Sequence, residues 1–162
     1  MYESTLIIGA TNVPNVLDIT QVQPGTLIVD DSGPHCFDSE LAIQRLQQQE
    51  DILFTEGGVL QLPHPITQLA KRQLEKLKIP GRTGHPFNIT GCVLSSLLTT
   101  TFSKINPTVG LVETSDCLQH YNLLKQLAIR AADLHCEEVV LPKEAIRNFR
   151  ERYGQPRCGC PN

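Results

Sequence analysis

The stretch GTLIVDD, residues 25–31, decides the fold class, because it is a short apolar run that ends in acidic residues. The stretch STLIIGATN at 4–12 repeats this form with small and polar residues at its end. Short apolar runs bounded by turn residues are typical of buried strands. The following stretch FDSELAIQRLQQQE at 37–50 predicts a helix, because Asp38 or Ser39 can cap its start.

The chain beyond residue 50 predicts further strands and helices. DILFTEGGVLQLP at 51–63 is expected to form a third strand, a break at Gly57-Gly58 and an extended continuation. Helical spacing or a helix start signal marks four more stretches: 66–79, 89–105, 115–134 and 142–153. Strand–helix–strand order with apolar strands predicts an α/β fold with a mainly parallel sheet flanked by helices.

Composition sets the class of protein. The chain has 162 residues, 40% of them hydrophobic, and a net charge of -3, which suits one domain over 1–153 and a loop tail over 154–162. The 14 basic residues are scattered, so we expect no nucleic-acid binding. No apolar run approaches the roughly 20 residues that span a bilayer, and no secretory leader pattern is present. We expect a cytoplasmic protein whose cysteines are reduced thiols or metal ligands.

Small and polar residues follow each predicted strand. They are Ala10, Thr11 and Asn12 after the first strand, residues 30–32 after the second, and residues 56–58 after the third. Each group could be only a turn, because these residue types favour turn conformations. In parallel sheets, however, ligands bind beyond the carboxyl ends of the strands. The three groups together predict a ligand crevice at that edge.

The stretch HPFNITGCVLSSLLTTTF at 85–102 places Cys92 near the start of a predicted helix. If Thr90 caps that helix with its side chain, Cys92 lies in the first turn, where free N–H groups and the macrodipole favour a thiolate. Cys92 also shares a helix face with serines and threonines, opposite the apolar stripe. It is therefore a candidate nucleophile, or else a surface cysteine without a role. His85 is its candidate acid–base partner, or simply an exposed loop residue.

The motifs follow one another in a recognisable order. IGATN at 8–12 is followed by PGTLIVDDSGP at 24–34, GGVLQLP at 57–63 and the cysteine-led GCVLSSLLTTTF at 91–102. This order resembles the C-terminal half of the cyanobacterial acyl-[acyl-carrier-protein] reductases and related predicted amino-acid dehydrogenases. The resemblance covers residues 4 to 140. Each motif is weak alone, and the ordered series carries the resemblance.

The resemblance implies a Rossmann-like domain, NADPH as cofactor and an acyl thioester or its carrier protein as substrate. Members of that family transfer the acyl group to an active-site cysteine and then release an aldehyde by hydride transfer. The position that matches the cysteine is Cys92. Ala10, Thr11 and Asn12 would lie along the dinucleotide, and Gly57 and Gly58 would approach the nicotinamide.

The sequence also departs from the family. It contains no G-x-G-x-x-G fingerprint, which holds the pyrophosphate in the first strand–helix unit. Ser95 and Ser96 stand where the family's helix carries an acidic residue, and the GPHCFD segment at 33–38 is outside the family's pattern. The chain therefore resembles the later half of such an enzyme. We expect a homo-oligomer, or a partner chain that supplies the missing N-terminal half.

A second hypothesis is a metal-binding or scaffold domain that lacks catalysis and needs a partner chain. It is motivated by the dipeptides His35-Cys36 and His135-Cys136 and by the Cys-x-Cys pair at 158–160. This last spacing is tighter than the Cys-x-x-Cys of structural zinc sites, and it occurs once. Zinc is therefore the alternative cofactor, but the sequence assigns no residue as a metal ligand.

Overall fold

The structure, a computed structural model, describes these residues: 1–66, 85–107, 109–137 and 139–154. Contacts divide the chain into two compact units. The first unit comprises Met1–Gly57 and Asp133–Asn162, and the second unit comprises Gly58–Ala132. In sequence, the second unit is therefore an insertion into the first. Within the described ranges, no helix has both the length and the apolar character that a membrane crossing requires.

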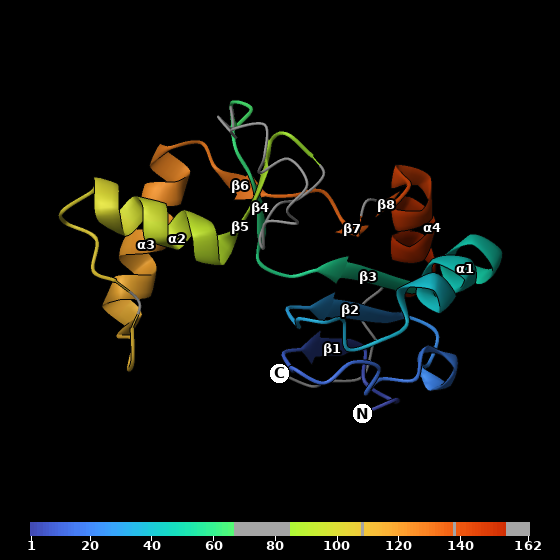
Figure 1. The fold of residues 1–162 in the computed structure, drawn as a ribbon. Coiled ribbons are helices and arrows are strands. Elements are labelled where there is room, and N and C mark those ends of the chain that lie inside the picture. The colour runs from blue at the N-terminus through green and yellow to red at the C-terminus, as the bar shows by residue number, and fades with distance from the viewer. Residues whose placement is uncertain (67–84, 108, 138, 155–162) are drawn as a thin grey trace, which may run out of the picture. The chain divides into compact units, whose positions relative to one another are not determined.

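The first unit is built on a parallel sheet of three strands in the order β1-β2-β3 (Figure 1). The strands are β1 (Leu6–Gly9), β2 (Thr26–Asp30) and β3 (Ile52–Glu56). Their register aligns Gly9 with Asp30 and Asp30 with Glu56. β1 is buried only at alternate residues, but the three predicted strands and their parallel arrangement are confirmed. As a result, the carboxyl ends of all three strands meet in one row.

Two helices cover the sheet of the first unit. Helix α1 (Ser39–Gln49) joins β2 to β3, and of the two predicted cap candidates it is Asp38 that accepts a hydrogen bond from the backbone N–H of Leu41. Helix α4 (Lys143–Tyr153) begins after Pro142, within one residue of the predicted start. Asn148 of α4 donates a hydrogen bond to the carboxylate of Glu50 at the end of α1, at 2.9 Å. The two helices therefore lie side by side over β3 (Figure 1).

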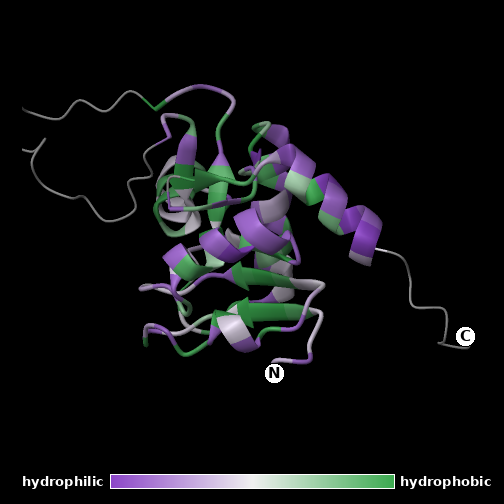
Figure 2. Ribbon diagram, turned by 90° about the vertical axis from the view of Figure 1, so that its right-hand side faces the viewer, coloured by the Kyte–Doolittle hydropathy of each residue, from purple (hydrophilic) through white to green (hydrophobic). Residues whose placement is uncertain are grey.

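Most of the core of the first unit lies on one face of this sheet, and Leu53 of β3, at 5% exposure, is buried on the other face. Ile7, Ile28 and Phe54 stand in one row and are 8%, 0% and 0% exposed. On the opposite face Leu6 and Ile8 of β1 are 51% and 67% exposed. Figure 2 shows the strands of this unit mostly hydrophobic (green) and α4 mostly hydrophilic (purple). Apolar strands thus bury one face against amphipathic helices, which is how layered α/β structures gain stability.

Two short connections complete the first unit. A 3-10 helix, η1 (Ile19–Gln21), is the only helix between β1 and β2. After the inserted second unit the chain returns as β7 (His135–Cys136), which pairs antiparallel with β8 (Val139–Val140). The backbone N–H of His135 donates to Thr55 Oγ1 at 3.3 Å. This bond places β7 beside the carboxyl end of β3.

The second unit combines a small antiparallel sheet with two helices. The sheet has the order β5-β4-β6, with β4 (Val59–Gln61), β5 (Asn88–Thr90) and β6 (Arg130–Ala131). The helices are α2 (Gly91–Thr101) and α3 (Thr114–Gln126). Its buried apolar side chains among the described residues are Val59, Ile89, Leu94 and Leu98. The predicted break at 57–58 and the extended continuation after it are confirmed.

Two predictions for the second unit are wrong, and one lies outside the described residues. The helix expected over 115–134 ends at Gln126, because Ala128 takes a left-handed conformation (φ 54°) and the chain then pairs with β4. Val93 and Leu97, expected on the apolar stripe of α2, are 37% and 52% exposed. Apart from residue 66, the helix expected over 66–79 falls in the part that is not described, as does most of the tail.

Candidate functional site

The carboxyl edge of the parallel sheet gathers side chains with nitrogen, oxygen and sulfur ligand atoms. β2 and β3 end in acidic residues, the loop after β2 carries one His-Cys dipeptide, and β7 carries the other. We call this group the edge cluster, and its members are Asp30, His35, Cys36, Glu56, His135 and Cys136.

Asp30 organises the loop that follows β2. It is 2% exposed, and its carboxylate accepts hydrogen bonds from His35 Nδ1 at 2.9 Å and from the backbone N–H groups of Cys36 and Ser32 at 3.1 and 3.2 Å. Burial acts to raise the pKa of Asp30, but hydrogen bonds from Ser32, Cys36 and His35 outweigh it and hold the pKa below its ordinary value. Since an ionised carboxylate only accepts, Nδ1 of His35 carries the proton and Nε2 is left to bind elsewhere.

Two histidine nitrogens face the carboxylate of Glu56 from different elements. His35 Nε2 lies 3.6 Å from Glu56 Oε1, and His135 Nε2 lies 3.7 Å from Glu56 Oε2. His135 is 6% exposed, and its Nδ1 lies 2.7 Å from the carbonyl oxygen of Asp133, to which it must donate. Its Nε2 is buried and has no hydrogen-bond partner among the described residues. Such an atom is unusual in a folded protein and indicates a missing partner.

Cys136 adds a sulfur atom to the same place. It is 0% exposed, and its Sγ lies with ligand atoms of His35 and Glu56 in a group whose members are all within 4.8 Å of one another. Burial, together with the charges of Glu56 and Glu137, raises the pKa of Cys136 to about 12. By itself this thiol therefore stays protonated at neutral pH.

Cys36 packs against the opposite side of Asp30. Burial, together with the hydrogen bond to Asp30 and the charge of that residue, raises the pKa of Cys36 to about 11. Gly9, at the end of β1, permits this packing. A Cβ at Gly9 would lie 2.5 Å from both Asp30 Oδ1 and Cys36 Sγ. A side chain at position 9 would therefore displace the loop that carries His35.

The residues predicted to lie along a dinucleotide are only partly brought together. Thr11 lies against the loop after β2, because its N–H donates to Ser32 Oγ at 3.0 Å. Ala10 and Asn12 are exposed beside it. Gly57 belongs to the same unit, where its N–H donates to the carbonyl oxygen of Asp30 at 2.7 Å, whereas Gly58 belongs to the second unit.

Cys92 occupies the predicted place at the start of a helix. It is exposed in the first turn of α2, and the helix begins directly after Thr90. The expected side-chain cap is absent, however, because Thr90 makes no capping hydrogen bond. Its Oγ1 lies 3.4 Å from Cys92 Sγ instead. The backbone N–H of Gly91 donates to the carbonyl oxygen of Gly58 at 2.6 Å, which fixes the entry into the helix.

His85 lies on a different feature of the second unit. Its Nδ1 accepts a hydrogen bond from the N–H of Phe87 at 3.4 Å, and the two rings lie 5.8 Å apart. Both residues line a surface pocket of about 440 Å³ together with Arg130. Cys92 is not among the described residues that line this pocket. The geometry therefore gives no support to His85 as the acid–base partner of Cys92.

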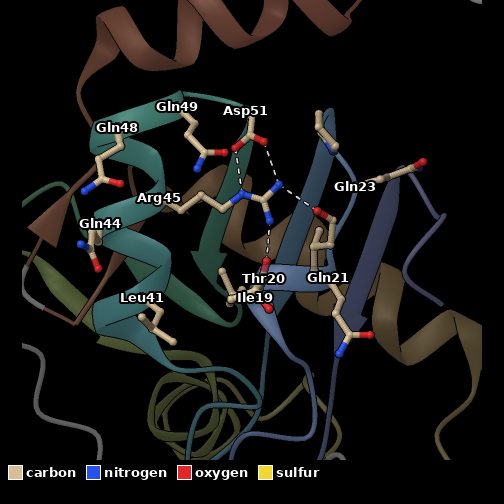
Figure 3. A pocket seen from close by; sticks show the side chains of 12 residues that line it. Ile19, Thr20, Gln21, Gln23, Leu41, Gln44, Arg45, Gln48, Gln49 and Asp51 are labelled. Atoms are coloured by element: carbon tan, nitrogen blue, oxygen red, sulfur yellow. Dashed lines mark hydrogen bonds and ion pairs between the residues drawn. The ribbon is translucent and has the colours of Figure 1, made fainter.

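A larger pocket in the first unit is occupied by structural hydrogen bonds. It measures about 550 Å³ and lies between η1 and α1 (Figure 3). Arg45 crosses it: the guanidinium binds Asp51 at 2.7 and 2.9 Å and also donates to the carbonyl oxygens of Ile19 and Val22. These hydrogen bonds occupy the N–H donors of Arg45 and connect α1 with η1 and with the start of β3. We therefore propose no catalytic or binding role for this pocket.

Sequence reasoning did not assign the edge cluster as one site. The signal that could have found it is the repeated His-Cys dipeptide, together with acidic residues at the ends of two predicted strands. A scan against protein-family models gives no match for this chain, and searches of curated proteins and of solved structures give none either. Both candidate sites therefore rest on sequence motifs and geometry.

Proposed function

We propose that this chain is an oxidoreductase domain with a Rossmann-like first unit, and that it accepts an acyl group from an acyl thioester on Cys92. The fold part of the proposal is supported by the three parallel strands in consecutive order, joined by helix α1 between β2 and β3. Consecutive parallel strands make up each half of a doubly wound sheet. The motif order described above supplies the link to acyl-thioester reductases.

The observation that carries the proposal is the place of Cys92. Its side chain is exposed in the first turn of α2. Thr90 does not cap this turn with its side chain, and the N–H of Gly91 already donates to Gly58, so the N–H groups of the turn that follow Gly91 are the ones that would face an incoming anion. These groups and the helix dipole would stabilise negative charge on Sγ and on the carbonyl oxygen of a bound thioester.

The proposed chemistry is an acyl transfer between two thiols. Cys92 Sγ, as the thiolate, attacks the carbonyl carbon of the substrate thioester. The bond from that carbon to the carrier sulfur breaks, the carrier leaves as a thiolate that takes up a proton, and an enzyme thioester remains on Cys92. Nothing is oxidised or reduced in this step, so it can be tested without a nucleotide.

The described residues of this chain do not fit NADPH by themselves. A dinucleotide needs a glycine-rich turn and a helix N-terminus for its pyrophosphate. Here β1 leads into an irregular loop and then the three-residue η1. We therefore derive no hydride step for this chain, and the proposal assigns NADPH binding to a partner chain or a second copy.

The proposal is tested by trapping the acyl-enzyme. The purified chain is incubated with a long-chain acyl-pantetheine thioester, and its intact mass is measured before and after treatment with hydroxylamine. We expect a hydroxylamine-labile acyl adduct that is lost in Cys92→Ala. Cys117→Ala is the matched control, since Cys117 is also an exposed helical cysteine of the second unit. An adduct that persists in Cys92→Ala, or none on the wild-type chain, contradicts the proposal.

Thiol labelling gives a second measurement. With limiting iodoacetamide at about one pH unit below the free-thiol value of about 8.5, we expect Cys92 to be alkylated faster than Cys117. Cys36 and Cys136 should react last, because they are buried and their pKa values are raised to about 11 and 12. Equal rates for Cys92 and Cys117 would remove the support for a nucleophile at Cys92.

A further inference from the structure

We propose that the edge cluster of the first unit is a structural zinc site, with His35, Glu56, Cys136 and His135 as the ligands. The site is separate from Cys92, which belongs to the second unit. The ligand atoms of His35, Glu56 and Cys136 already lie close together. The fourth ligand is His135, whose buried imidazole faces Glu56 from β7.

The distances suit a tetrahedral ion. Zinc binds imidazole nitrogen and carboxylate oxygen at about 2.0–2.2 Å and thiolate sulfur at about 2.3 Å, so its ligand atoms lie about 3.3–3.7 Å from one another. The two separations between histidine nitrogens and Glu56 oxygens are 3.6 and 3.7 Å. The group of His35, Glu56 and Cys136 spans no more than 4.8 Å. His135 Nε2 lies outside that group and faces the other Glu56 oxygen, so an ion held by His35, Glu56 and Cys136 would have to draw the His135 ring closer to complete the site.

Both histidines are already oriented for metal binding. The Nδ1 of His35 is held by the carboxylate of Asp30 at 2.9 Å, and the Nδ1 of His135 by the carbonyl oxygen of Asp133 at 2.7 Å. Ligating histidines typically donate their second ring nitrogen to a carboxylate or a backbone carbonyl in this way. In the neutral form of each ring the remaining atom, Nε2, is the one available as a ligand.

An ion would also satisfy groups that the protein leaves without a partner. His135 Nε2 is buried and accepts no hydrogen bond from the described residues. Asp30 and Glu56 bring two carboxylates to the edge of the sheet, and Glu137 adds a third acidic residue beside Cys136. A divalent cation would offset this negative charge and hold the Cys136 sulfur as a thiolate, with release of its proton.

The donor set selects the kind of metal. Calcium and magnesium take oxygen ligands, whereas imidazole and thiolate ligands favour zinc among the common divalent ions. His135 and Cys136 are nearly or fully buried, so four protein ligands would enclose the ion and leave no open position. Closed sites of this type hold structure together. This one would join the loop after β2, the end of β3 and β7, which returns after the inserted second unit.

The test begins with metal content. The full chain is stripped with a chelator, reconstituted with zinc, and its bound metal is measured by elemental analysis. We expect about one equivalent per chain and a higher Tm than for the stripped protein. Cobalt(II) in place of zinc should give thiolate-to-metal charge transfer and the d–d bands of a tetrahedral site. Less than about a tenth of an equivalent after reconstitution overturns the proposal.

Variants locate the ion. His35→Ala and Cys136→Ser should each weaken zinc binding at least about tenfold, and the second should abolish the charge-transfer band. His35→Ala is the safer variant for folding, because the side chain of His35 is 25% exposed. Cys117→Ser is the control for loss of an exposed thiol, and Cys92→Ala should also keep its zinc.

One further variant separates the edge cluster from the Cys-x-Cys pair of the tail. The double substitution Cys158→Ser and Cys160→Ser should leave zinc content and the cobalt spectrum unchanged. If this double variant loses the metal while Cys136→Ser keeps it, the ion belongs to the tail and the proposal is wrong. None of these readouts depends on acyl transfer, so the two proposals can fail independently.

Discussion

The two units of this chain differ in the size of their apolar cores and in whether they bury functional polar groups. The first unit packs a large apolar core, with Phe37 and Phe54 edge to face at its centre, and buries Asp30 and His135 beside it. In the second unit only a few described side chains are buried, and Cys92 is exposed. A large core can hold buried polar groups in fixed positions, which a metal site requires. A nucleophile at an exposed helix start needs a further surface to exclude water.

The largest expected effect is a loss of stability on truncating a core side chain. It tests whether the larger core also contributes more to the free energy of unfolding. Phe54→Ala removes a side chain that is 0% exposed and should lower the free energy of unfolding by about 3–5 kcal/mol. Leu98→Ala in the second unit, at 5% exposure, should cost about 2–3 kcal/mol, because a small core can partly collapse around the cavity. Urea denaturation of both variants measures the difference. An equal or larger loss for Leu98→Ala would break the comparison.

The exposed Leu6 provides the control for these two variants. It lies on β1, where this face of the sheet is exposed, and its own exposure is 51%. Leu6→Ala should change the free energy of unfolding by no more than about 0.5 kcal/mol. A substantially larger loss would mean that this face is covered in solution, for example by a second copy of the chain.

The next effect compares two arginines. Arg45 in the first unit is 11% exposed, forms an ion pair with Asp51 and donates to two backbone carbonyls. Arg45→Met should lower the free energy of unfolding by about 3 kcal/mol, because it leaves the largely buried carboxylate of Asp51 without its counter-charge. Arg130 in the second unit is exposed and donates to the neutral side chain of Gln61. Arg130→Met should change the free energy of unfolding by no more than about 0.5 kcal/mol. Thermal or urea unfolding of the two variants measures the difference.

The smallest effect compares two helix starts. Asp38 caps α1 by accepting the N–H of Leu41 at 3.0 Å, whereas Thr90 makes no side-chain capping bond at α2. Asp38→Ala should therefore lower the free energy of unfolding by about 1 kcal/mol, and Thr90→Ala by a few tenths at most. If Thr90→Ala cost as much as Asp38→Ala, the helix start that carries Cys92 would be capped in solution after all.

Local patterns in the sequence predicted the elements that local interactions determine. The sequence predicted the strands β1 to β3, a cap for α1 at one of two neighbouring residues, and the start of α4 to within one residue, because apolar runs, caps and proline act within a few residues. The C-terminal end of α3 was not predicted correctly. Ala128 and Ala131 fit a helical pattern, but the pairing of β6 with β4 depends on residues far away in the sequence.

For the same reason, the sequence predicted only part of the edge cluster. The sequence identified the polar ends of the strands, but only the parallel register places Asp30 beside Glu56. Only the return of the chain as β7 brings His135 and Cys136 to that row. The position of Cys92 at a helix start could be predicted, because it depends on its immediate neighbours. The lack of a Thr90 cap could not, because it depends on side-chain rotation.

The insertion of the second unit also sets the order in which the two segments of the first unit are synthesised. Residues 1–57 are synthesised early, but β7 and α4 follow only after residues 58–132. Closing a connection of that length costs only about 2 kcal/mol more than closing one of about ten residues, so the delay is kinetic and not thermodynamic. We therefore expect the edge cluster to be among the last parts of the first unit to form.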